Sequence, residues 1–210
     1  VIMIAAIALL LPAVALAASI DQRIVGGSNV NIADYPWQGS FRTSSGSHNC
    51  GCVFVGGNYV LSAAHCGGST SHTLEFGASN RNTGTVYSVT STTLHPNYGQ
   101  GPGFTPNDLS ILTTSVNIGG TNQSPATIAT SPNNPAPTTA QITGWGRLCG
   151  GCAIPVELQG TPIGLISDAE CTAQWGTSFQ SSNMICVWDG AQGTVGACNG
   201  DSGGPMTIGS

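Results

Sequence analysis

Short runs of alternating apolar and polar residues recur along the chain, and clusters of glycine, proline, serine and asparagine separate them. The runs are rich in valine, isoleucine, threonine and tyrosine, which favour the pleated, half-buried surface of a β-strand. The clearest of these runs predict strands within residues 52–63, 72–79, 85–95, 108–116 and 139–145.

One segment, Ser167–Trp175, instead predicts a short helix, because Ser167 can cap it and Glu170 stands three residues later. Many short strands with turn residues between them indicate an all-β protein built as a sandwich or as barrels. The uncharged segment Pro125–Ala140 is rich in proline and asparagine. We interpret it as an extended linker between two halves of the molecule.

The composition is typical of a loop-rich β protein, and it argues against two classes of binding partner. The 210 residues include 30 glycines and 12 prolines, and only 6% are charged. Four basic residues stand against nine acidic ones, for a net charge of −5. So little basic surface argues against nucleic acids and anionic membranes as partners.

The amino terminus is an apolar run that ends in Ala15-Leu16-Ala17, the small-residue pattern of a signal peptidase site. We therefore expect residues 1–17 to be a signal peptide and the protein to be secreted. A membrane anchor is the competing interpretation, but Pro12 interrupts the run, which is also short for a span. The eight cysteines of a secreted chain predict disulfides. A zinc site at Cys149 and Cys152 lacks a second ligand pair of suitable spacing.

Ser202 stands in the sequence Gly-Asp-Ser-Gly-Gly near the end of the chain. This matches the nucleophile elbow of α/β-hydrolases, which also requires a parallel sheet with helices and a histidine after the serine. The strands before Ser202 lack intervening helices, and no histidine follows it. A serine nucleophile needs a base, and the histidines available are His48, His65, His72 and His95.

His65 is the strongest candidate base, because it ends an apolar strand beside Cys66. His95 and His72 lie in what we expect to be surface turns or loops. Asp108 opens another apolar strand, where a carboxylate entering the core needs a hydrogen-bonding partner. The three candidates therefore follow one another in the order His, Asp, Ser.

With this order and five motifs, the chain resembles the chymotrypsin-like (trypsin-fold) serine endopeptidases. The motifs, in family order, are IVGG at 24–27, SAAHC at 62–66, NDLSIL at 107–112, GWG at 144–146 and GDSGGP at 200–205. The resemblance runs from Ile24 to the end of the chain. It implies two antiparallel six-stranded β-barrels, an N-terminal one at 24–131 and a C-terminal one at 132–210 that is incomplete.

The resemblance also implies roles for the candidate residues. Ser202 would attack the peptide carbonyl, His65 would take and return its proton, and Asp108 would orient His65. The main-chain N–H groups of Gly200 and Ser202 would form the oxyanion hole. The expected substrates are proteins or peptides, with a digestive role favoured by the short pro-segment.

Activation is implied by Arg23 and Ile24, with residues 18–23 as a propeptide. Cleavage after Arg23 by a trypsin-like protease would free the ammonium group of Ile24, which in the family pairs with the acid before the nucleophile, here Asp201. His48 matches a family position that helps to hold that acid in the zymogen.

Specificity is implied by Gly196, which stands where trypsin-like members carry an aspartate, with Ala197 beside it. Without an acid there, we expect a chymotrypsin- or elastase-like preference for an apolar P1 residue. Broad-specificity invertebrate members, in which a charge elsewhere in the pocket restores cleavage after basic residues, stay open as an alternative.

The family bridges correspond to Cys50–Cys66 and Cys171–Cys186, and the family partner of Cys198 would lie in a segment beyond Ser210. Cys149 could pair with Cys152, or one of the two could reach Cys52. We expect no cofactor and no metal, since the loop 78–84 has no carboxylate for calcium. We also expect a monomer. Two competing hypotheses are a catalytically inactive homologue that acts as a binding protein, and an α/β-hydrolase esterase.

Overall fold

The computed structural model describes residues 24, 26–101, 105–130, 136–189 and 195–209. The proposed signal peptide, the propeptide and Arg23 lie outside these residues. In the part of the chain that the structure describes, no helix has the length and apolar character needed to cross a membrane.

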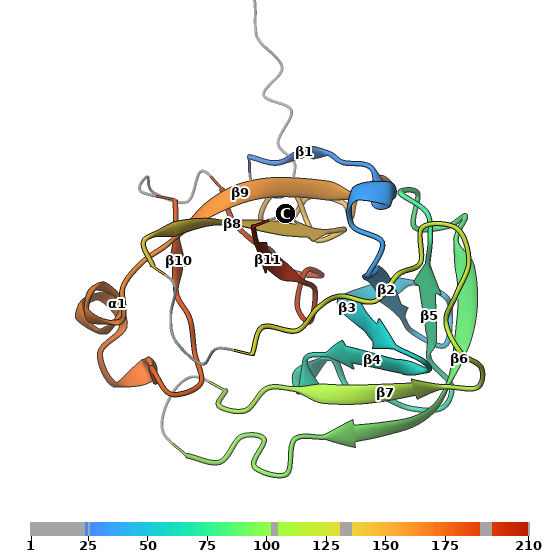
Figure 1. The fold of residues 1–210 in the computed structure, drawn as a ribbon, viewed down its shortest axis with the longest axis horizontal. Helices are drawn as coiled ribbons and strands as arrows, with labels where there is room; N and C mark the ends of the chain where they lie inside the picture. The colour runs from blue at the N-terminus through green and yellow to red at the C-terminus, as the bar shows by residue number, and fades with distance from the viewer. Residues whose placement is uncertain (1–23, 25, 102–104, 131–135, 190–194, 210) are drawn as a thin grey trace, which may run out of the picture.

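The first half of the fold is a closed antiparallel barrel with the strand order β2-β3-β4-β7-β6-β5 (Figure 1). Its strands are β2 (Gln38–Arg42), β3 (His48–Gly56), β4 (Tyr59–Ser62), β5 (Thr73–Phe76), β6 (Thr85–Leu94) and β7 (Ser110–Thr114). Because each strand hydrogen-bonds to a neighbour on both sides, the barrel leaves no open sheet edge.

The second half is an antiparallel sheet with the order β1-β9-β8-β11, and β10 also pairs with β9. Its strands are β1 (Ser28–Asn29), β8 (Thr138–Gly144), β9 (Gln159–Leu165), β10 (Val187–Trp188) and β11 (Met206–Ile208). The observed fold is therefore all-β, with one complete six-stranded barrel and a second, open sheet, which agrees with the fold class that the family resemblance implied. β1 belongs to this second sheet, so the start of the described chain crosses over to the C-terminal half (Figure 1).

The helices found in the described residues are few and short, and they lie outside the sheets. They are the 3-10 helices η1 (Ile32–Asp34), η2 (Ala64–Cys66) and η3 (Gly176–Ser178) and the α-helix α1 (Asp168–Trp175). The predicted helix is confirmed with its capping box: the Ser167 hydroxyl accepts from the Glu170 N–H, and the Glu170 carboxylate accepts from the Ser167 N–H.

The predicted linker is shorter than expected. Thr138, Thr139 and Ala140 belong to β8, where they pair with Leu165, Gly164 and Ile163 of β9. The polar, proline-rich composition before them hid the start of this strand. In the linker itself, residues 131–135 lie outside the described residues.

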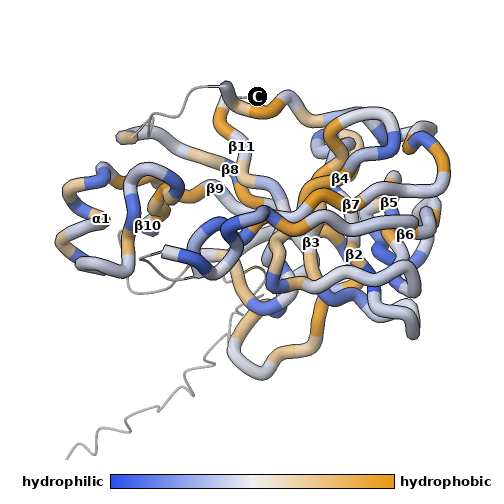
Figure 2. Tube along the Cα trace, turned by 90° about the horizontal axis from the view of Figure 1, so that it is seen from below, coloured by the Kyte–Doolittle hydropathy of each residue, from blue (hydrophilic) through white to orange (hydrophobic). Residues whose placement is uncertain are grey.

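Each half has its own apolar core. Phe41, Phe54, Leu74, Phe76 and Leu112 fill the barrel, all with less than 4% of their surface exposed. In Figure 2, hydrophobic stretches run through the barrel, for example around β4. A smaller cluster lies on the second sheet and includes Ile24, Ala140, Ile142, Ile163 and Leu165.

Three disulfides lie in the described part of the chain: Cys50–Cys66, Cys171–Cys186 and Cys149–Cys152. The first two are the pairs that the family resemblance implied, and the third settles the open choice for Cys149. Cys52, which is buried, and Cys198 have free thiols. Burial raises the pKa of the Cys52 thiol, so this cysteine is a neutral core residue.

One buried ion pair holds the end of β2 against β5. The Glu75 side chain is only 3% exposed, and its carboxylate accepts a hydrogen bond from the Arg42 guanidinium. The Glu75 carboxylate accepts a second hydrogen bond, from the Gly84 N–H at 2.6 Å. Arg42 also donates from Nε to the Gly46 carbonyl at 2.7 Å, so the charges are paired and hydrogen-bonded.

Removal of one charge of this pair should therefore destabilise the barrel. We expect Glu75→Gln to cost about 3 kcal/mol, since it leaves the Arg42 guanidinium without a counter-charge. For a chain of this length, the melting temperature should fall by about 6–12 °C. Glu157→Gln, at an exposed position, is the matched control and should shift it by no more than about 2 °C. Equal melting temperatures for the two variants would contradict this role.

Candidate active site

Strand pairing in the barrel brings His65 and Asp108 together. β4 pairs with β7 so that Ser62 lies opposite Ser110. The Ser110 hydroxyl donates to the carbonyl oxygens of Ser62 and Ala63 at 3.2 Å each. His65 follows β4 in η2, and Asp108 precedes β7. The ladder thus places both residues just beyond its last pair, at the same end of the barrel.

Asp108 makes two contacts with His65. One carboxylate oxygen accepts the main-chain N–H of His65 at 2.8 Å, and the other lies 2.5 Å from the ring atom Nδ1. The two contacts fix both the place and the orientation of the ring, which leaves Nε2 free to face another group. The side chains of His65 and Asp108 are 45% and 23% exposed, so the pair is open to the cavity beside it.

Ser202 reaches the same place from the C-terminal half. The Asp201 N–H donates to the Cys198 carbonyl, and the Gly204 N–H donates to the Asp201 carbonyl, both at 2.9 Å. Ser202 therefore lies in the second of two consecutive tight turns that precede β11. Gly51 of β3 donates its N–H to the Ser202 carbonyl at 2.8 Å, which ties these turns to the barrel.

Glycine is required where these turns approach the barrel. A Cβ atom at Gly203 would lie 2.3 Å from the Ser62 hydroxyl oxygen, and one at Gly51 would lie 2.7 Å from Cα of Gly204. Both distances are far inside van der Waals contact. The glycines around Ser202 thus allow the two halves to meet main chain to main chain.

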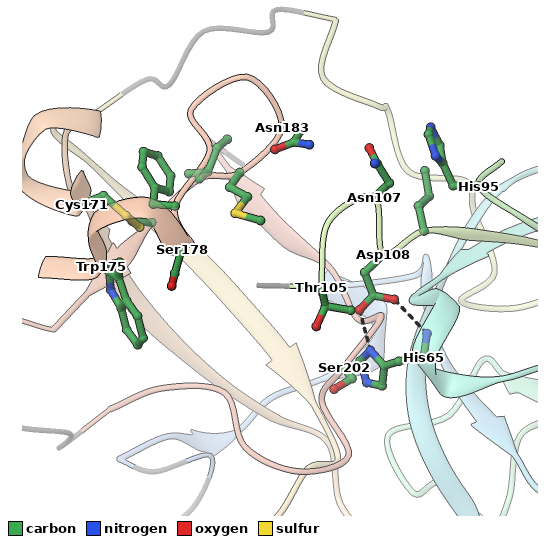
Figure 3. Close-up of a pocket in the computed structure, with 15 residues that line it drawn as sticks. His65, His95, Thr105, Asn107, Asp108, Cys171, Trp175, Ser178, Asn183 and Ser202 are labelled. Carbon is green, nitrogen blue, oxygen red and sulfur yellow. Dashed lines mark hydrogen bonds and ion pairs between the residues drawn. A yellow bond between two sulfur atoms is a disulfide. The ribbon is translucent and has the colours of Figure 1, made fainter. Parts of the chain in front are cut away.

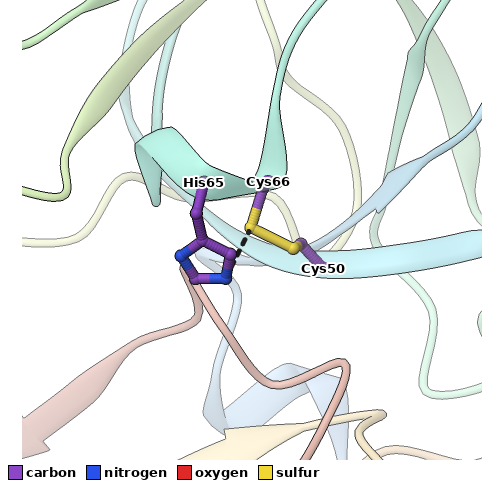
Figure 4. A group of neighbouring side chains, drawn as sticks. All are labelled: Cys50, His65 and Cys66. Carbon is purple, nitrogen blue, oxygen red and sulfur yellow. Dashed lines mark hydrogen bonds between the residues drawn. A yellow bond between two sulfur atoms is a disulfide. The ribbon is translucent and has the colours of Figure 1, made fainter. Parts of the chain in front are cut away.

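Ser202, His65 and Asp108 line one cavity of about 1180 Å³, and Figure 3 shows Ser202 beside the His65 ring. Cys66 Sγ lies 3.9 Å from Nε2 of His65 and 3.7 Å from the Ser202 carbonyl oxygen. Both residues therefore lie against the Cys50–Cys66 disulfide, and Figure 4 shows the ring beside it. The Ser202 hydroxyl makes no hydrogen bond with His65 here; such bonds commonly tighten only when substrate binds.

Cys50, Cys66 and His65 each place a potential metal-ligand atom within 4.8 Å of the others. Both sulfur atoms are consumed by the disulfide, however, and a disulfide sulfur is not the thiolate that a metal ion needs. This group of residues does not fit a metal centre.

Two main-chain donors beside Ser202 point to no protein acceptor. Among the described residues, none accepts a hydrogen bond from the N–H of Gly200 or of Ser202. Gly200 has φ +105°, a conformation that side chains disfavour, and a Cβ there would lie 3.1 Å from Cα of Gly146. Two free N–H groups next to a serine hydroxyl form an arrangement that can bind an oxyanion.

Asp201 is a buried carboxylate, with 8% of its surface exposed. It accepts hydrogen bonds from the N–H groups of Gly146 at 2.7 Å and Cys198 at 2.9 Å. Burial raises the pKa of Asp201 above its usual value, and the two hydrogen bonds oppose that shift only in part. Ile24 is 1% exposed and packs in the core of the second sheet. Its nitrogen is still joined to Arg23, so it carries no ammonium group in this chain.

The family resemblance implied that His48 helps to hold Asp201, but the hydrogen bonds of its ring are with Ser40 and Gly200. Its Nδ1 lies 2.7 Å from the Ser40 hydroxyl and its Nε2 lies 3.0 Å from the Gly200 carbonyl oxygen. The ring also stacks edge-on against Trp145, with 6.0 Å between centroids. His48 thus holds the peptide beside Ser202 through Gly200. The sequence could not distinguish the two partners, because Gly200 and Asp201 are adjacent.

The wall of the cavity opposite His65 comes from residues that the sequence did not mark as functional. Figure 3 shows Trp175 and Ser178 on this side. Its apolar members are Trp175, Phe179, Met184 and Ile185, together with the Cys171–Cys186 disulfide. Trp175 is 61% exposed, and nothing in its sequence context reveals that. Gly196 and Ala197, the expected specificity residues, do not line this cavity.

Comparison with known proteins agrees with this geometry. Residues 24–210 match the family model described as Trypsin. The chain is 39% identical over 196 residues to the fibrinolytic enzyme, isozyme C, of Lumbricus rubellus, covering 87% of this chain and 81% of that protein. It is 33% identical over 206 residues to a chymotrypsin-like serine proteinase of Haliotis rufescens, covering 91% and 80%.

The fold has a close counterpart among solved structures. A structure titled "Neuropsin, a serine protease expressed in the limbic system of mouse brain" superimposes with a TM-score of 0.77. It is 22% identical to this chain and the match covers 87% of this chain and 81% of the other. The protein is a serine endopeptidase. It belongs to the trypsin family.

The buried position of His48 predicts how stability depends on pH. Burial lowers the pKa of His48 from its ordinary value of 6.5 to about 4. The unfolded chain therefore binds more protons than the folded one between these values. The stabilisation is complete above pH 6.5 and is lost as the pH falls to about 4, by about 3 kcal/mol.

The test compares the free energy of unfolding of the wild type and His48→Gln between pH 4 and 7. Asp201, whose pKa is raised, contributes a trend of opposite sign near the acid end, but both proteins contain it. The wild type should therefore lose about 3 kcal/mol more than the variant. Parallel pH profiles for the two proteins would show that His48 is not held neutral.

Proposed function

We propose that this protease hydrolyses peptide bonds through Ser202, with His65 as the general base and Asp108 as its orienting partner. The observation that supports the proposal best is the double contact of Asp108 with His65, at a cavity that Ser202 also lines. A serine hydroxyl is a poor nucleophile until a neighbouring base accepts its proton.

The chemistry follows from these positions. As Ser202 Oγ attacks the carbonyl carbon, its proton moves to Nε2 of His65, and Asp108 stabilises the imidazolium from the Nδ1 side. The free N–H groups of Gly200 and Ser202 donate to the oxyanion of the tetrahedral intermediate. His65 then protonates the leaving amine, which leaves an acyl-enzyme. A water molecule, deprotonated by His65, releases the acid product and restores Ser202.

We also propose that cleavage after Arg23 activates the enzyme. Asp201 is a buried carboxylate with no ion-pair partner among the described residues, and such a charge is costly. Cleavage would create an ammonium group on Ile24, whose side chain is already buried on the second sheet. The new positive charge would neutralise the carboxylate of Asp201. Asp201 follows Gly200, whose N–H is a proposed oxyanion-hole donor, directly in the chain. The activating enzyme must cleave after arginine, and the amino-terminal apolar run would direct secretion.

The proposed preference at P1 is for apolar residues. Gly196 offers no carboxylate to a P1 lysine or arginine, and a buried charge without a partner is disfavoured. Gly196 does not line the cavity beside the candidate triad, so the lining of that cavity is no measure of the P1 preference. The absence of an acid at Gly196 fits a chymotrypsin- or elastase-like specificity.

Replacement of the nucleophile tests the proposed mechanism. In the activated protein, Ser202→Ala should lower kcat for a chromogenic peptide substrate by about 10⁶-fold, since no acyl-enzyme can form. Ser44→Ala, at an exposed position in a loop of the barrel, is the matched control and should keep the wild-type rate. A Ser202→Ala variant with more than a tenth of that rate would rule out Ser202 as the nucleophile.

Peptides that differ only at P1 test the proposed specificity. The activated protein should cleave after Leu, Phe or Ala at least about 100-fold faster, in kcat/KM, than after Arg. Gly196→Asp should raise the rate after Arg, because a Cβ at this position meets no atom within 4 Å and leaves room for a carboxylate. If Arg is the fastest P1 residue in the wild type, the apolar preference is wrong.

A further inference from the structure

The loop that contains the Cys149–Cys152 disulfide lies beside the turns that carry Ser202, and none of the proposed roles uses it. Its two ends are anchored to the barrel. Before the loop, Trp145 Nε1 donates to the Ser79 carbonyl at 2.9 Å. After it, Arg81 Nε donates to the Pro155 carbonyl, also at 2.9 Å. The disulfide therefore closes an excursion between two fixed points.

Arg147 connects this loop to the candidate oxyanion hole. Its main-chain N–H donates to the Asn199 carbonyl at 2.8 Å. Its guanidinium Nη1 donates to the Cys152 carbonyl. The neighbouring Gly146 donates to the Asp201 carboxylate at 2.7 Å. The two main-chain donors thus hold the residues on either side of Gly200.

The loop that the Cys149–Cys152 disulfide closes is too small for the bridge to contribute much to the global stability of the protein. It spans 3 positions, whereas the other two bridges span 16 and 15. The loop-closure entropy that a disulfide removes from the unfolded chain increases with loop length, so the smallest loop gains least. At the loop tip, a Cβ on Gly150 would meet no atom within 4 Å. Any effect of the bridge is therefore expected to be local, and Cys152, one of its two ends, accepts a hydrogen bond from Arg147.

We propose that the Cys149–Cys152 disulfide loop is a positioning device for the oxyanion hole, which holds Arg147 against Asn199 and so fixes the orientation of the Gly200 peptide. The inference rests on the proposed role of the Gly200 N–H. The Gly200 N–H would donate its hydrogen bond to the substrate oxyanion, which exists only in the transition state and the tetrahedral intermediate. Loss of the brace should therefore lower kcat and leave KM almost unchanged.

The loop also makes turnover sensitive to thiol reductants. A dithiol donates two electrons and two protons to the bridge, its S–S bond breaks, Cys149 and Cys152 become thiols, and the dithiol becomes a cyclic disulfide. Both cysteines are half-buried and the glycines between them are exposed, so a small reductant can reach the bridge. The Cys171–Cys186 bridge also lines the cavity, so the Cys149→Ser/Cys152→Ser double variant, which keeps that bridge, is the control for its reduction.

The test uses the Cys149→Ser/Cys152→Ser double variant, with Gly150→Ala as a matched control that changes the same loop and keeps the bridge. Loss of a whole oxyanion donor lowers kcat by roughly 10²–10³-fold, and a loosened donor should cost about 10-fold. We expect that fall in kcat, a KM within about twofold of the wild type, and about 10-fold weaker binding of a peptide aldehyde. Mild dithiol treatment should lower the kcat of the wild type to that of the double variant, and it should leave the kcat of the double variant unchanged.

A second readout does not depend on activity. Hydrogen exchange, followed by mass spectrometry of the peptide that contains Arg147, should be faster in the double variant and unchanged in Gly150→Ala. Unchanged exchange, or faster exchange with an unchanged kcat, would overturn the proposal. So would a rise in KM that accompanies a lower melting temperature, since that is the signature of general destabilisation. If the wild type itself lacked activity, the proposed function would fail, while the exchange rates would still decide whether the loop holds Asn199.

Discussion

The carboxylate of Asp108 is the group on which the arrangement of the site depends. It binds the main-chain nitrogen and the ring of His65 at once, so a single acid fixes where the imidazole lies and which nitrogen it presents. Asp108 can reach His65 only if the end of β4 lies beside the start of β7, and the pairing of these two strands places them there. The closed barrel thus holds Asp108 against His65. The turns that carry Ser202 come from the other half of the molecule.

The second half contributes main chain more than side chains. The turns around Ser202 meet β3 and the end of β4 through glycines, because any Cβ there would collide with the barrel. Around Gly200, three separate elements hold one short stretch: His48 binds its carbonyl, Gly146 binds the carboxylate of Asp201, and Arg147 binds the carbonyl of Asn199. The candidate oxyanion hole is thus fixed from the barrel, from the Gly-Trp-Gly segment and from the disulfide loop. Preorganised donors of this kind are the main means by which proteases stabilise developing charge.

Much of this could be predicted from the sequence, for physical reasons that can be named. The barrel strands alternate in polarity with period two, and Ser167 with Glu170 marks the start of α1. The order of His65, Asp108 and Ser202 singled out three candidate residues; the structure places Asp108 against His65, and Ser202 lines the same cavity. β9 was not among the predicted strands, because Gly160, Pro162 and Gly164 disfavour a strand. The structure tolerates Pro162 because β1 pairs with β9 before it and β10 pairs after it.

Long-range choices were not available from local patterns. Whether His48 contacts Gly200 or Asp201, whether Cys149 pairs with Cys152, and which apolar residues face the cavity all depend on tertiary packing. The rate at which a serine-directed phosphonate forms an adduct at Ser202 is the clearest check on the Asp108–His65 arrangement. In the activated protein, Asp108→Asn should slow this labelling by about 10⁴-fold, because the ring would be held in the wrong tautomer. Labelling at the wild-type rate in that variant would contradict the role given to Asp108 and, with it, the proposed mechanism.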